Sequence, residues 1–88
     1  MKIKNGFVLT EAAGNSLVVA VGEMADKFSG YVKLNSTGAF IWKQIEKKDM
    51  SVLELAELLA SEYDISLETA TRDIEAFENT LVKAGILE

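Results

Sequence analysis

The stretch that decides the fold is Tyr31–Glu46, YVKLNSTGAFIWKQIE. In its first four residues, Val32 and Leu34 alternate with Tyr31 and Lys33, which is the period of a half-buried strand. A strand is therefore predicted over residues 31–34.

An amphipathic helix is predicted to follow this strand. Asn35 or Ser36 supplies a short side-chain oxygen, which accepts hydrogen bonds from the free N–H groups of a first helical turn. The bulky apolar residues beyond it fall on adjoining helical faces: Ala39, Phe40, Trp42 and Ile45. We expect the rest of the chain to pack on them.

Two strands are predicted before this stretch. Phe7–Glu11 and Ser16–Val21 are rich in β-branched and aromatic residues, and Gly14 and Asn15 between them are typical of a turn. The continuous apolar run within the second strand indicates that it is central or covered on both faces.

The segments on either side of this hairpin are less regular. Met1–Gly6 is predicted to be a polar, frayed lead-in. Gly22–Gly30 is interpreted as a connector with one helical turn, under which Phe28 packs.

Two more helices are predicted after the first. Ser51 and Glu54 form a capping box, followed by an apolar face of Leu55, Leu58, Leu59 and Tyr63. Ser66 caps the third helix, and Gly85 is expected to end it in a left-handed conformation. Between them lies a single apolar stripe, Leu67, Ala70, Ile74, Phe77 and Leu81.

Strands followed by helices indicate an α+β fold, with three helices against one face of a three-stranded antiparallel sheet. The tight corner between the last two helices favours an arrangement like a winged helix-turn-helix. With 88 residues, of which 49% are hydrophobic, the chain is expected to form one domain over residues 1–88.

The composition argues against an enzyme or a metalloprotein. The chain has neither cysteine nor histidine, so the commonest metal ligands and the commonest general base are missing. The remaining carboxylate pairs are typical of solvated helix faces. We therefore predict no catalytic residue, no cofactor and no metal site. No apolar run is long enough to span a membrane, and a cytoplasmic protein without a membrane partner is expected.

Two binding modes remain open. The first is DNA recognition by the third helix as in a winged-helix transcriptional regulator, but its exposed face has one arginine and one asparagine among four acids. The second is strand addition, in which an extended peptide pairs with a free sheet edge. Residues 51–88 carry nine acids against Arg72 and Lys83, which disfavours a nucleic-acid partner. A sheet edge covered by the connector or by a second copy of the chain is equally compatible with the pattern.

The chain resembles the PqqD family from Phe7 to its C-terminus. The resemblance lies in the entry to the first helix, LNSTGAFIW (34–42), and in two stretches of the last helix and its end, TRDIEAF (71–77) and LVKAGIL (81–87).

The resemblance implies a recognition domain for ribosomally synthesised and modified peptides. Such a domain binds the leader segment of a precursor peptide and presents it to a modifying enzyme, often a radical S-adenosylmethionine (SAM) enzyme. In this family the leader lies between the third strand and the third helix. By position, the resemblance implies a strand edge of Tyr31, Val32, Lys33 and Leu34 and a helix wall of Thr71, Ile74, Glu75 and Glu78. An acidic wall of this kind suggests a leader with a basic residue.

Two departures from the quinone-pathway members favour a different peptide product. Lys47–Met50 stands where those members carry an Asp-Gly corner, and the connector Val21–Gly30 is longer. The expected protein is a non-enzymatic adaptor, monomeric or homodimeric, with two partners: a precursor peptide and its modifying enzyme.

Overall fold

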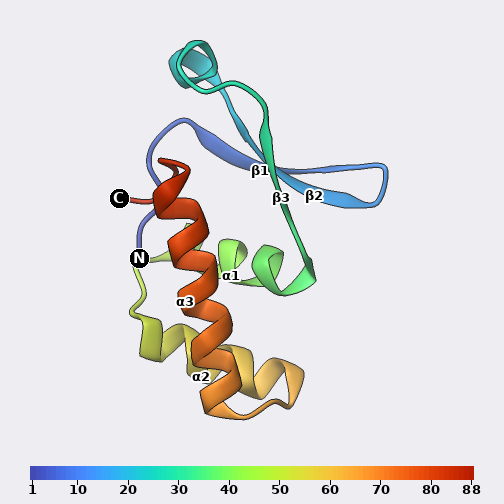
Figure 1. Ribbon diagram of the computed structural model, residues 1–88, viewed down its shortest axis with the longest axis vertical. Coiled ribbons are helices and arrows are strands. Elements are labelled where there is room, and N and C mark those ends of the chain that lie inside the picture. Colours follow the sequence, from blue (N-terminus) through green and yellow to red (C-terminus); the bar gives the residue numbers. More distant parts are fainter.

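The computed structural model describes residues 1–88 and has three strands followed by three helices, the predicted α+β fold (Figure 1). The strands are β1 (Phe7–Ala12), β2 (Asn15–Ala20) and β3 (Tyr31–Leu34), with a short 3-10 helix η1 (Gly22–Asp26) before β3. The helices are α1 (Ser36–Lys47), α2 (Val52–Tyr63) and α3 (Leu67–Lys83). None of the helices is both long and apolar enough to cross a membrane.

The sheet is antiparallel, in the order β1-β2-β3. The central position of β2 accounts for its apolar run, because both of its edges are paired. Phe7 lies opposite Ala20, and Val18 lies opposite Val32. The connector does bring Phe28 against the sheet, where its ring packs edge-on to that of Phe7 with the centroids 5.0 Å apart.

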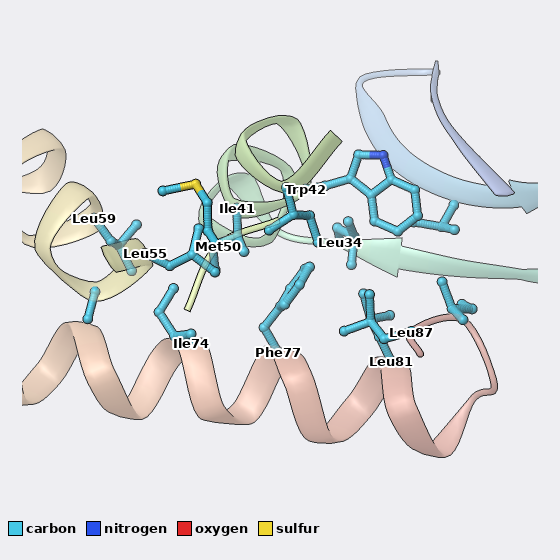
Figure 2. Packing of buried hydrophobic residues seen from close by; sticks show 14 of the residues in the cluster. Leu34, Ile41, Trp42, Met50, Leu55, Leu59, Ile74, Phe77, Leu81 and Leu87 are labelled. Carbon is cyan, nitrogen blue, oxygen red and sulfur yellow. The ribbon is translucent and has the colours of Figure 1, made fainter. Parts of the chain in front are cut away.

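The core lies between α3 on one side and α1, α2 and the sheet on the other. Figure 2 shows Ile74, Phe77 and Leu81 of α3 pointing toward Ile41 and Trp42 of α1. All five side chains are buried, and burial of each large apolar side chain contributes about 1.5–3 kcal/mol relative to exposure. The helix on which the rest of the chain was expected to pack, α1, therefore lies at the structural centre of the domain.

Three members of the predicted apolar faces lie at the surface instead. Leu58 is 40% exposed, and Leu67, at the first position of α3, is 47% exposed. The buried face of α2 is centred on Leu55 and Leu59, which leaves Leu58 on its flank. Tyr63 is also exposed, although its ring packs edge-on against Phe40.

The prediction of a frayed N-terminus was wrong. Ile3 pairs with Leu87 in an isolated antiparallel bridge, and the Lys4 N–H donates to the Ile86 carbonyl at 2.9 Å. Both Ile86 and Leu87 are buried, so pairing with them holds the first residues against the end of the chain. Figure 1 shows the two termini close together. The sequence of this segment looks polar because only alternate residues face the core.

The predicted helix boundaries are confirmed. Ser51 and Glu54 form the capping box, with both hydrogen bonds 3.1 Å long. Ser66 Oγ accepts from the Thr69 N–H, also at 3.1 Å. Gly85 ends α3 with a φ of 80°, a left-handed conformation that glycine adopts without steric cost.

Candidate functional site

The outer edge of β3 is free. One edge of this strand pairs with β2, from Tyr31 opposite Val19 to Leu34 opposite Ser16, and no strand lies beyond the other. A free edge leaves backbone N–H and C=O groups without a strand partner, which is the requirement for pairing with another extended chain. The C-terminal end of this strand leads into the start of α1 (Figure 1).

The junction of β3 and α1 is held tightly. The Asn35 side chain accepts a hydrogen bond from the Gly38 N–H at 2.7 Å, and the Ala39 N–H donates to the Asn35 carbonyl. Gly38 allows the close approach of helix and strand, because a Cβ atom there would lie 3.3 Å from Leu34 Cβ. The end of β3 is therefore fixed in place rather than free to move as a loop.

A groove of about 270 Å³ lies between this junction and α3. The strand and its turn contribute Lys33, Leu34 and Asn35, and the first turns of α1 contribute Thr37, Gly38 and Ile41. The wall opposite is α3, with Asp73, Ala76, Phe77, Thr80 and Leu81. The groove thus combines an apolar floor with hydroxyl and amide groups and two charged residues, Lys33 and Asp73.

The strand half of the predicted site lies at this groove. Lys33 and Leu34 line it, and Tyr31 and Val32 continue the same strand away from it. Burial alternates along β3: Leu34 is buried and Val32 half-buried against the core, whereas Tyr31 and Lys33 are exposed. Alternate side chains of β3 therefore face inward toward the helices and outward to solvent.

The helix half of the predicted site does not line the groove. Thr71, Glu75 and Glu78 lie on the other flank of α3, and Ile74 is fully buried in the core. The residues that face β3 are Asp73, Ala76, Phe77 and Thr80, which recur at the i, i+3, i+4 and i+7 spacing of a single helical face. The helical periodicity of the sequence shows that these four residues share one face of α3. It does not show that this face lies beside β3.

The groove contains no constellation typical of catalysis. No group of three or more His, Cys, Asp or Glu side chains in the molecule is arranged to hold a metal ion. Asp73 is the one carboxylate at the groove, so there is no second carboxylate with which it could form a general acid–base pair. What the groove offers is free backbone groups of β3 on one side and side chains of α3 on the other, the combination used in peptide recognition by strand addition.

Comparison with known proteins gives a family match and two structural matches. The model of the family described as Coenzyme PQQ synthesis protein D (PqqD) matches residues 9–87. No curated protein sequence matches the chain.

Both structural matches are solved complexes. TbiB1 in complex with the TbiA(beta) leader peptide superposes with a TM-score of 0.79 and 23% identity, over 100% of this chain and 95% of that one. Lasso peptide synthetase B1 complexed with the leader peptide has a TM-score of 0.77 and 23% identity, over 99% of this chain and 95% of that one. At this identity the likeness establishes the fold.

Proposed function

This chain belongs to the PqqD family, and from that premise we propose that it is a non-catalytic adaptor for a ribosomally synthesised precursor peptide. The leader segment of the precursor adds as a strand to the free edge of β3 and lies against α3. The bound leader brings the rest of the precursor to a modifying enzyme.

The observation that carries this proposal is the free edge of β3 beside a groove walled by α3. Its support comes from the shared fold, because both structurally similar proteins were solved with a leader peptide bound. A covered edge would have argued against strand addition, and here neither the connector nor the N-terminal segment pairs with it.

Strand addition at β3 involves few backbone groups. Alternate residues of an antiparallel strand direct both N–H and C=O to the same side, so two of the four residues of β3 face the free edge. Each backbone hydrogen bond contributes on the order of 1 kcal/mol net. Most of the affinity and all of the side-chain specificity must therefore come from contacts within the groove.

The proposed peptide-contacting residues follow from this arrangement. Tyr31, Val32, Lys33 and Leu34 provide the strand edge, as the family resemblance implies. On α3 we assign the wall to Asp73, Ala76 and Thr80. This replaces the expected wall of Thr71, Ile74, Glu75 and Glu78, which face another side of the helix or the core.

The second proposed partner is the modifying enzyme. The family resemblance implied a radical SAM enzyme, whereas one structurally similar protein is described as a lasso peptide synthetase B1. The partner that we propose is a peptide-modifying enzyme in the cytoplasm. Co-purification with enzymes encoded beside the gene would identify the class.

The test is an NMR titration of the isotopically labelled protein with leader peptides of precursors encoded near its gene. We expect amide shifts at residues 31–35 and at Asp73, Ala76, Phe77 and Thr80, and smaller shifts at Glu75 and Thr71 on the other flank of α3. A DNA duplex serves as the control for a transcriptional regulator and should give no response. Shifts on α3 with DNA, and none with any leader peptide, would reject the adaptor.

A further inference from the structure

We infer that Asp73 selects leader peptides that carry a basic side chain on the face directed into the groove. This inference rests on the proposed function, because it concerns the chemistry of the peptide that occupies the groove. It adds a specificity-determining residue and a class of ligand, a cationic leader.

Asp73 is a charged group without an ionic partner at the edge of an apolar floor. None of the four ion pairs in the molecule includes it. The chain's one arginine, Arg72, is adjacent in sequence but forms its ion pair with Glu68, at 2.8 Å, one turn earlier in α3. Phe77 and Ala76 lie beside Asp73 in the groove wall.

Lys33 does not supply the missing charge. It is the other charged residue at the groove, but it forms no ion pair with Asp73. The Lys33 side chain is exposed and alternates with the inward-facing side chains of Val32 and Leu34. An added strand beside β3 would also lie between the strand and α3, which separates the two residues further.

An entering peptide displaces water from Asp73 and must replace the lost hydration. A carboxylate that is partly removed from water without a partner is unfavourable, whereas a lysine or arginine restores the lost interactions through a charge-assisted hydrogen bond. A neutral leader leaves Asp73 unpaired beside apolar groups. The groove therefore favours cationic leaders in two ways: it attracts their basic side chain, and it disfavours neutral leaders because they leave Asp73 desolvated and unpaired.

The strand geometry restricts where the basic residue stands in the leader. Side chains of an extended peptide alternate, so those directed into the groove are two or four positions apart. One of them must lie over the apolar floor formed by Leu34, Ile41 and Phe77. We therefore expect a basic and a bulky apolar residue separated by an even number of positions.

The test is selection from a displayed random-peptide library on three proteins: the wild type, Asp73→Asn and Glu75→Gln. Glu75 is the matched control, because it is an exposed acid two residues away on the same helix but outside the groove. Each substitution removes one negative charge, so both change the net charge of −5 equally. Enrichment of a basic residue at even spacing from an apolar one is expected with the wild type and Glu75→Gln, and its loss with Asp73→Asn.

A second measurement uses the most enriched synthetic peptide and its variant with glutamine at the basic position. In fluorescence anisotropy, the wild type should bind the basic peptide about tenfold or more tightly than the variant, and Asp73→Asn should reduce this ratio toward one. Circular dichroism of the three proteins verifies that each is folded.

The outcomes separate this inference from the proposed function. Peptides enriched by the wild type without a basic preference would overturn the role of Asp73 and leave the adaptor intact. A basic preference that survives in Asp73→Asn would also overturn it, because the overall negative charge would then be responsible. A wild type that enriches no peptide would overturn both.

Discussion

Leu81→Ala tests how the two ends of the chain are held to the core. Leu81 is 0% exposed, and its carbonyl accepts hydrogen bonds from the N–H groups of Ile86 at 2.9 Å and Leu87 at 3.4 Å. Leu87 in turn pairs with Ile3. The Leu81 side chain is thus enclosed both by the helices and by the segment that returns after Gly85.

The expected loss is about 3 kcal/mol in the free energy of unfolding. Truncation of a buried leucine to alanine costs about 2–5 kcal/mol, because apolar contacts are lost and a cavity remains. At about 0.05–0.15 kcal/mol per residue, 88 residues have a total stability of about 4–13 kcal/mol. At about 4–8 °C per kcal/mol, the loss lowers the melting temperature by about 12–24 °C.

The assay is urea unfolding followed by tryptophan fluorescence. Trp42 is the one tryptophan of the chain and is fully buried, so its emission reports directly on the core. Val82→Ala is the matched control, since Val82 is the next residue of α3 but is 48% exposed. This control should change stability by about 0.5 kcal/mol or less.

A loss below about 1 kcal/mol for Leu81→Ala, or one equal to that of Val82→Ala, would refute the reasoning. The C-terminal segment would then not be closed over α3 in solution. A large loss accompanied by a smaller urea dependence of the unfolding free energy would instead indicate that the termini detach as a separate unit.

Three further predictions concern the helix ends. The hydrogen bond from the Ser51 N–H holds the pKa of Glu54 below its ordinary value of 4.5, and the Ser51 hydroxyl has a smaller effect in the same direction. As the pH falls, the unfolded chain therefore takes up the proton before the folded protein does. Stability is therefore lost from about pH 4.5 downward, and Glu54→Gln should flatten that part of a plot of melting temperature against pH. Gly85→Ala should lower the free energy of unfolding in urea by about 1 kcal/mol, because a φ of 80° is strained for any residue with a side chain. No atom lies within 4 Å of the added methyl group, so the loss comes from the backbone alone. An unchanged stability would refute the left-handed conformation at the end of α3. Ser66→Ala should also lower the free energy of unfolding by about 1 kcal/mol, because the Thr69 N–H loses its acceptor. Ser66→Gly should lower it by only about a few tenths of a kcal/mol. Equal losses for the two variants would argue against the helix cap.

The sequence by itself determined the elements, their order and their ends. Caps such as Asn35 and Ser66 act within one helical turn, and a helical stripe or a strand alternation depends only on local periodicity. The continuous apolar run of β2 indicated a strand that is central or covered on both faces, and the structure has it at the centre of the sheet. The alternation over residues 31–34 is local too and predicted the strand β3, whereas its place in the candidate site was implied by the family resemblance.

Only the tertiary structure decided which flank of α3 faces β3. Periodicity defines the buried stripe through Ile74 and Phe77, but it leaves two exposed flanks that carry acids alike, Asp73 on one and Glu75 on the other. The rotation of α3 about its own axis is set by its packing on α1 and α2, through contacts between residues distant in sequence. The pairing of Ile3 with Leu87 is decided in the same way, since strand pairing between opposite ends of a chain leaves no local signal.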